Sequence, residues 1–239
     1  YDYDKWSFID PKEAQKKLNL PRNPRDYTSI AVTTDDSNDE IVYASSMGDG
    51  VIQYKNGTPV QSYNEKNAFK ETAGGYGSGY CYIDGLAFDK NGNLWMTSSE
   101  VNHAVLVLDK AGAWHRLDIE QLRGVYTIND ILITSTNDKW IYVPRNTPKL
   151  VMIPNSESLD EVSSYEFTTL IDTDGKELTP SNYTCVAEDK DGYIWVGTNR
   201  GAVYFTKPRI SSAEDKAATR CTRVKYTNEE TGNLAYFLD

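Results

Sequence analysis

The chain has 239 residues, a formal net charge of −10 and a sequence pI near 4.8. Such a surface repels phosphate groups, so nucleic acid and anionic membranes are poor partners for this protein. No apolar run approaches the roughly 18 residues that a membrane-spanning helix needs. The 17 Tyr and five Trp, with many Thr, Asn and Gly residues, favour strands and tight turns over helices.

The first 27 residues are predicted to form a lead-in with one short surface helix. The stretch from Pro11 to Leu18 starts with Pro, which suits the first helical turn, and is rich in helix formers. The chain begins at Tyr1 without an initiator Met or a signal peptide. We therefore expect it to be a processed or excised piece of a longer protein.

From residue 28 onward one pattern returns four times: an alternating strand, a turn of Asp, Asn and Gly, a strand with a large apolar residue, and a third strand. It is clearest at residues 89–97 and 189–198, where an Asp-x-x-Gly turn leads into an apolar-Trp strand. The anchor residues of the four copies are Val42, Trp95, Trp140 and Trp195. The copies lie roughly 45 to 55 residues apart, a period typical of repeats that each form one small sheet.

The repeat predicts four antiparallel strands in each copy. First strands are predicted at residues 29–33, 83–88, 128–133 and 183–187; third strands at 50–54, 104–108, 150–153 and 202–205; fourth strands at 59–63 and 114–119. Four strands per repeat indicate an all-β β-propeller, with blades at about residues 28–70, 80–122, 125–170 and 180–239. A β-sandwich has no reason to repeat one motif at this period, and a β-helix coil is shorter.

About four blades are present, and we expect a partial propeller or one completed by another chain. An open row of blades leaves free sheet edges that invite pairing with other strands. The anchor tryptophans are predicted to pack in the core between neighbouring blades, because a large flat ring fills the space between two sheets.

The pattern Asp-x-x-Gly-x-Ile-Trp-Val-Gly-Thr-x-x-Gly-x-x-Tyr at residues 189–204 resembles the two-component regulator propeller repeat. That family forms periplasmic sensor propellers of hybrid two-component systems in Bacteroidetes, and similar repeats occur in propellers of the Por (type IX) secretion system. The resemblance is close for residues 185–204, good for 83–108 and weaker for 28–54 and 128–153. It implies a periplasmic or cell-surface location and a binding role, and it brings no catalytic residues and no cofactor.

Candidate ligand-binding residues lie in loops that a propeller places on one face. The loop between the second and third strands of a blade shares that face with the connection to the next blade, and function concentrates in such loops. The Gly- and Tyr-rich segment at residues 73–82 is such a connection, and its tyrosines offer apolar faces with polar tips to a sugar ring or a protein. The predicted ligand-binding residues are Tyr76, Tyr80, Tyr82, Asn102, His103, Arg145, Asn199 and Arg200. For each of them alone, a linker or a solvated loop is the competing interpretation.

No metal site is predicted from the turn motifs. Asp89, Asn91 and Asn93 have the spacing of a calcium-binding loop, but Leu94 stands at the sixth position, where such a loop needs Gly for its bend. The motif is therefore interpreted as a hairpin turn.

The three cysteines are predicted to be small buried side chains. Cys81, Cys185 and Cys221 form no Cys-x-x-Cys pair and have no metal-ligand spacing. Free Cys is among the residue types that are most often buried.

The leading hypothesis is a non-catalytic module of the cell envelope that binds a glycan, a small molecule or a protein through its loop face. It would act as a sensor or as a secretion-associated scaffold, with a homo-oligomer as a further possibility. The alternative is a lyase- or lactonase-type propeller enzyme with a divalent metal at the channel, for which the inner strands offer Asp84 and Asp130. The two histidines, His103 and His115, are too few for a multi-His centre.

Overall fold

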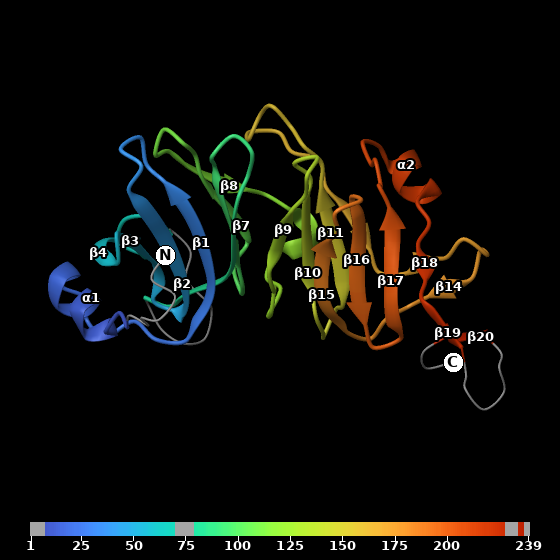
Figure 1. Cartoon of the computed structure of the whole chain (residues 1–239), viewed down its shortest axis with the longest axis horizontal. Coiled ribbons are helices and arrows are strands. Elements are labelled where there is room, and N and C mark those ends of the chain that lie inside the picture. The colour runs from blue at the N-terminus through green and yellow to red at the C-terminus, as the bar shows by residue number, and fades with distance from the viewer. Residues whose placement is uncertain (1–7, 70–78, 228–233, 237–239) are drawn as a thin grey trace.

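The computed structural model describes residues 8–69, 79–227 and 234–236. The described residues form four blades of four antiparallel strands each, which stand side by side in a curved row (Figure 1). The first two blades are joined because Met47 pairs with Tyr82 and Gly48 pairs with Cys81. The predicted all-β propeller is confirmed in its partial form.

The strands follow the chain from blade to blade. Blade 1 consists of β1 (Tyr27–Thr34), β2 (Glu40–Gly48), β3 (Gly50–Lys55) and β4 (Thr58–Tyr63). Blade 2 consists of β5 (Cys81–Phe88), β6 (Leu94–Ser98), β7 (Val105–Leu108) and β8 (Trp114–Leu117). Blade 3 consists of β9 (Ile131–Ile133), β10 (Lys139–Val143), β11 (Lys149–Ile153) and β12 (Tyr165–Phe167). Blade 4 consists of β15 (Tyr183–Glu188), β16 (Tyr193–Thr198), β17 (Gly201–Thr206) and β18 (Thr222–Arg223).

Short elements connect the blades and flank the row. They are α1 (Pro11–Leu18), the 3-10 turn η1 (Glu120–Leu122), the hairpin of β13 (Leu170–Ile171) and β14 (Glu177–Leu178), α2 (Ala213–Ala218), and the pair β19 (Lys225–Thr227) and β20 (Leu234–Tyr236). Helix α1 begins where the Asp10 carboxylate accepts the Lys12 N–H, and it ends at Asn19 in the left-handed conformation. Within the described residues no helix is long and apolar enough to cross a membrane.

The predicted strands agree with the structure except at the inner strand of blade 3 and at two outer strands. Strand β9 contains only the last residues of the predicted range 128–133. The outer strands β12 and β18 have three and two residues, and the sequence pattern missed both. Strands this short are held by pairing with β11 and β17, so they carry too little alternation to be read from the sequence.

Two of the three anchor tryptophans pack between neighbouring blades, as predicted. Trp95 of β6 lies in a buried cluster with Ile131 and Ile141 of blade 3. Trp140 of β10 lies in a second cluster with Ile194 and Phe205 of blade 4. Both rings are 1% exposed. Blades 2 and 3 therefore each turn their tryptophan toward the blade that follows in the chain.

The prediction for Trp195 was wrong, and so was that for Cys185. Trp195 is 36% exposed, and Cys185 is exposed as well. Both lie on the face of blade 4 that points away from blade 3, together with Tyr204, whose ring centroid is 4.9 Å from that of Trp195. No blade formed by the described residues covers this face, so the position that is buried in blades 2 and 3 meets solvent in blade 4. Cys81 and Cys221 are buried as predicted.

The anchor residue of blade 1 is Ile41 and not Val42. In blade 2 the turn closes where the Asp89 N–H donates to the Asn93 carbonyl, and Trp95 follows as the second residue after it. In blade 1 the Asp35 N–H donates to the Asp39 carbonyl, which places Ile41 at the equivalent position. A shift by one residue turns a side chain to the other face of the sheet. Val42 accordingly packs against the group of side chains that α1 covers.

Candidate functional site

The repeated Asp turn is a structural joint. Asp89 Oδ1 accepts the N–H groups of Asn91 and Asn93, both at 2.9 Å, and its Oδ2 accepts the indole Nε1–H of Trp95 at 2.9 Å. The carboxylate thus fixes the turn with one oxygen and the tryptophan rotamer with the other. This geometry accounts for the conjunction of Asp, Gly and Trp without a bound cation, in agreement with the hairpin interpretation.

The same joint recurs at other hairpins. Asp189 Oδ2 accepts the Nε1–H of Trp195 at 2.8 Å, and this bond together with backbone N–H donors lowers the pKa of the Asp189 carboxyl. Between β7 and β8, Asp109 Oδ2 lies 2.9 Å from Nε2 of His115, which occupies the position of the tryptophans. The His115 bond likewise lowers the pKa of Asp109. The imidazole of His115 in β8 therefore interacts with the Asp109 turn.

The loops predicted to bind a ligand do lie on one side of the row. Antiparallel pairing within each blade puts the β6–β7, β10–β11 and β16–β17 loops at the same end of their sheets, opposite the Asp turns. In these loops Asn102, Arg145 and Arg200 are exposed, and His103 is partly buried. These residues come from three different blades and share one face.

Asn199 has a structural role on that face. Its Oδ1 accepts the N–H groups of Ser181 at 2.9 Å and Asn182 at 3.1 Å, and its own N–H donates to the Asn182 carbonyl. The side chain ties the β16–β17 loop to the connection that enters blade 4. Its hydrogen-bonding oxygen is therefore occupied, which makes Asn199 a support for the neighbouring Arg200.

The predicted tyrosines lie at the blade 1 end of this face. Tyr80 and Tyr82 form an edge-to-face pair with ring centroids 6.3 Å apart, and the Arg22 guanidinium stands 4.6 Å from the centre of the Tyr80 ring. Arg22 also forms an ion pair with Asp49 in the β2–β3 loop. Tyr76 lies outside the described residues.

Arg22 and Asp49 are functional candidates that the sequence pattern missed. They help to line a cavity of about 290 Å³, whose lining also includes Leu20, Glu65 and Gly79. Arg22 belongs to the lead-in and Asp49 to blade 1, and no motif links the two segments. Only the fold of the lead-in against the loop face brings their charges together, so the sequence held no signal for this cavity.

The two carboxylates of the enzyme hypothesis lie on the inner side of blades 2 and 3, where Asp84 is buried and Asp130 is exposed. Asp84 is 7% exposed, and its Oδ2 accepts the Ser99 hydroxyl at 2.7 Å. Asp130 Oδ1 accepts the N–H of Ile131. Desolvation raises the pKa of both carboxyls, that of Asp84 to about 7. Among the described residues no group of three or more His, Cys, Asp or Glu side chains is placed to hold a metal ion.

Hydroxyl groups link the inner parts of neighbouring blades. In each of the three contacts a side-chain O–H donates to a backbone carbonyl of the next blade: Thr28 to Ile83 at 2.7 Å, Thr97 to Asn129 at 2.9 Å, and Tyr142 to Thr184 at 3.1 Å. These bonds hold the inner strands at a fixed spacing. The loop face is therefore presented by rigid blades.

The buried Asp84 predicts a pH-dependent stability. Since its pKa is near 7 in the folded chain and near 3.9 when unfolded, the folded state holds the proton more tightly between these values. The contribution of Asp84 to the free energy of unfolding should therefore be largest below about pH 4 and should fall as the pH rises to about 7. Asp84→Asn should abolish a fall in the free energy of unfolding of about 4 kcal/mol between pH 4 and pH 8. Urea unfolding of both proteins across that range measures it, and Asp36→Asn, an exposed carboxylate, serves as control; equal pH slopes in all three proteins would contradict the assignment.

Residues 177–200 match the family model described as "Two component regulator propeller". No curated protein shows significant sequence similarity to the chain. Among solved structures, PorZ, a surface component of the type-IX secretion system of Porphyromonas gingivalis, is 21% identical with a TM-score of 0.79, over 100% of this chain and 32% of PorZ. The extracellular domain of BT4673 from B. thetaiotaomicron, described as a hybrid two component system, is 15% identical with a TM-score of 0.51, over 76% of this chain and 22% of that one.

A gluconolactonase of Xanthomonas campestris, XC5397, is 13% identical with a TM-score of 0.45, over 74% of this chain and 58% of that one, and is too distant to support a conclusion. The chain spans about a third or less of the length of PorZ and of the BT4673 domain. Its fold, its repeated Asp-Trp joint and the matched segment agree with one another. The chain is a partial β-propeller with a repeat of the two component regulator propeller type, similar to PorZ and to the extracellular domain of a two component system.

Proposed function

We propose that the chain is a non-catalytic propeller module of a bacterial cell envelope that binds a ligand through its loop face. The observation that carries this proposal is the similarity to PorZ over the whole chain, at a TM-score of 0.79. PorZ is a surface component of a secretion system, and the similar part of BT4673 is its extracellular domain. Both comparisons support a location outside the cytoplasm and a role as scaffold or sensor.

The loop face supports a binding role for physical reasons. Exposed side chains from several blades gather at one end of rigid sheets, which is how propellers and other repeat folds build binding surfaces. Arg145 and Arg200 project cationic groups from that face of a protein that is acidic overall. The pair of Tyr80 and Tyr82 adds aromatic surface next to the cavity of Arg22 and Asp49. Such a combination suits a glycan or a protein surface with carboxylate groups.

The alternative is a lyase- or lactonase-type enzyme. Asp84 and Asp130 are the inner-strand carboxylates that it would use. The Asp84 carboxylate is bound to Ser99 in the packed interior, and Asp130 lies against the backbone of Gly85 in blade 2. A turnover assay with gluconolactone in the presence of divalent cations tests this alternative directly, and hydrolysis that Asp84→Asn abolishes would overturn the non-catalytic proposal.

A matched pair of variants tests the loop face. Arg145→Ala/Arg200→Ala removes two charges from the proposed binding face, and Lys190→Ala/Arg209→Ala removes two exposed charges at the opposite side of blade 4. On an array of bacterial and host glycans, and with envelope proteins in solution, we expect the loop-face variant to bind about tenfold more weakly. The control should bind as the unchanged chain does. Equal binding by both variants would contradict a role of this face.

A further inference from the structure

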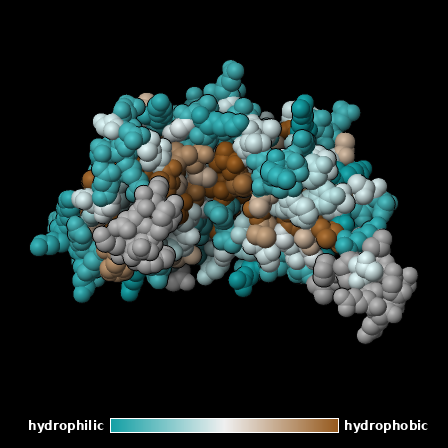
Figure 2. Space-filling view, viewed as in Figure 1, coloured by the Kyte–Doolittle hydropathy of each residue, from teal (hydrophilic) through white to brown (hydrophobic). Residues whose placement is uncertain are grey.

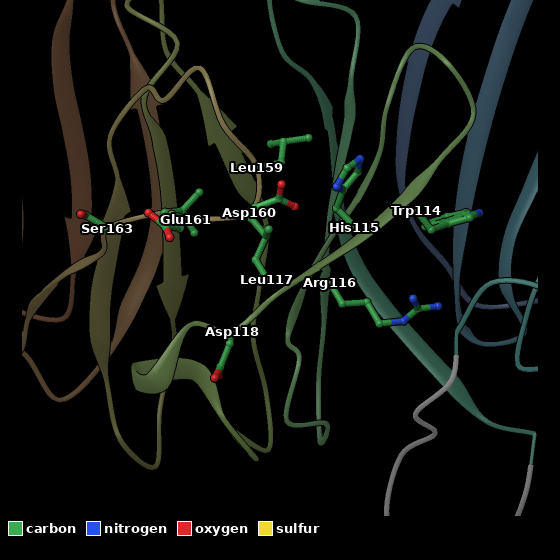
Figure 3. Close-up of a pocket in the computed structure, with 10 residues that line it drawn as sticks. Trp114, His115, Arg116, Leu117, Asp118, Leu159, Asp160, Glu161 and Ser163 are labelled. Carbon is green, nitrogen blue, oxygen red and sulfur yellow. The ribbon is translucent and has the colours of Figure 1, made fainter.

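A groove lies on the outer rim between blades 2 and 3 of the described part of the chain. Its volume is about 700 Å³, within the range of ligand-binding clefts. One wall is β8 with the following Asp118, and the other is the segment of residues 159–163 that leads toward β12 (Figure 3). Five consecutive residues line each side of the groove, an arrangement that suits an extended chain lying between them.

The first wall is a free strand edge. Strand β8 pairs with β7 on one side, and no described strand pairs with its other side. The Asp109 N–H donates to the Ala113 carbonyl, and along an antiparallel pair every second residue forms such bonds. The backbone N–H and C=O groups of His115 and Leu117 therefore point toward β7. The backbone N–H and C=O groups of Trp114 and Arg116 therefore face the groove. They are available to a further strand.

The free edge of β8 differs from that of blade 1. The outer strand β4 is contacted by helix α1, which lies against blade 1. Beside β8 the neighbouring segment stands off and leaves a groove. A free, accessible edge is a template for an added strand unless a protein blocks it.

The second wall is anchored, so the groove exists before any ligand arrives. Leu159 and Val162 pack against the buried cluster that contains Trp95. Beyond them, the Ser164 hydroxyl donates to Oε1 of Gln121 at 2.8 Å. Because these contacts already hold the segment at both ends, little conformational entropy is lost in ordering it when a ligand binds.

The charges that remain in the groove are acidic. Asp160 and Glu161 are exposed, and neither forms an ion pair with another described residue. The cations nearby are committed elsewhere: Arg116 donates to the Ala68 carbonyl on the far side of β8, and Arg123 pairs with Asp118. In Figure 3 the Asp160 carboxylate extends toward β8, while Arg116 and Trp114 point away from it. The groove thus favours a ligand with positive charge.

We propose that this groove binds a basic, extended peptide segment of a partner protein, which adds to blade 2 as a fifth strand beside β8. Main-chain hydrogen bonds to Trp114 and Arg116 provide the affinity, and Asp160 and Glu161 select Lys or Arg side chains on the segment. The site is separate from the loop face, so it stands or falls independently of the glycan or protein binding proposed above.

The test uses three end-blocked hexapeptides and the whole chain. Lys-Val-Lys-Val-Lys-Val is the probe, Glu-Val-Glu-Val-Glu-Val reverses its charge, and a third peptide keeps the lysines but carries N-methyl groups on its valine amides. Binding is measured by calorimetry, and hydrogen exchange is followed at the amides of Trp114 and Arg116. We expect the basic probe to bind and to slow exchange at both amides. The N-methylated and acidic peptides should each bind at least tenfold more weakly.

Two variants with the same change of charge complete the experiment. Asp160→Asn/Glu161→Gln should weaken binding of the basic probe about fivefold, as expected for two partly exposed ion pairs. Asp36→Asn/Glu214→Gln, which neutralises exposed carboxylates elsewhere, should leave the affinity unchanged. The proposal is overturned if the basic probe does not bind, if the N-methylated peptide binds equally well, or if both variants weaken binding to the same extent.

Discussion

Trp95→Ala should lower the free energy of unfolding by about 3–5 kcal/mol, the cost of a large cavity in a packed core. The ring is 1% exposed and fills the space between blades 2 and 3. Its loss also removes the indole donor from Asp89 and the aromatic face 4.4 Å from the ammonium group of Lys139. Lys139 is itself 1% exposed, and this burial lowers its pKa. The cation–π contact with Trp95 offsets part of the cost of burying the ammonium group, and the substitution removes it. Urea unfolding followed by circular dichroism measures the change.

Trp195→Ala is the matched control, because it removes the same side chain with the same bond to an Asp. Trp195 is 36% exposed and contacts Tyr204 within its own blade. Its replacement leaves no cavity between blades, and we expect a loss of about 1 kcal/mol. Equal losses in the two variants would show that the tryptophan acts through its turn alone, and not through packing against the next blade.

Gly85→Ala should lower the free energy of unfolding by about 3 kcal/mol, because the added methyl group would overlap atoms of the neighbouring blade. A Cβ at this position of β5 would lie 2.7 Å from the backbone nitrogen of Ile131 and 2.8 Å from Cα of Asp130. Both atoms belong to the chain entering blade 3, so relief requires the two blades to separate. Separation would also break the hydrogen bond of Thr97 to Asn129. Thermal and urea unfolding both report the loss.

Gly112→Ala is the control for that experiment. Gly112 lies in the Asp109 turn with a φ of +87°, and a Cβ there would have no neighbour within 4 Å. Its replacement should cost about 1 kcal/mol, through backbone strain alone. If Gly85→Ala proved no worse than Gly112→Ala, the close approach of blades 2 and 3 would not be a determinant of stability.

The sequence predicted the blades because the signals that define them are local. The Asp-x-x-Gly turn and the alternating strand lie within a dozen residues, and the structure reproduces them at Asp89 and Asp189. The sequence pattern could not assign the anchor of blade 1, since the turn there has Asn38 in place of Gly and Ile41 in place of Trp. The exposure of Trp195 was equally inaccessible, because it depends on whether another blade covers blade 4.

The candidate sites were only partly predictable, since they join segments that are distant in the chain. Topology alone placed Arg145 and Arg200 on one face. The ion pair of Arg22 with Asp49, by contrast, requires the lead-in to fold back on blade 1. The groove beside β8 depends on a loop whose anchoring residues, Leu159 and Val162, belong to no recognisable motif. Neither feature leaves a periodic trace in the sequence.

The Asp joint also bears on how far such repeats can diverge. One carboxylate oxygen is committed to the backbone, but the other accepts whatever donor is at hand: an indole in blades 2 and 4, an imidazole at Asp109, and the Lys55 ammonium at Asp35. The turn geometry therefore survives substitutions that erase the recognisable signature. In blade 3 the corresponding residue is Thr134, whose hydroxyl oxygen accepts the Asp138 N–H. Only residues 177–200 match the family model, yet all four blades share one architecture. The blades are therefore more alike in structure than in sequence.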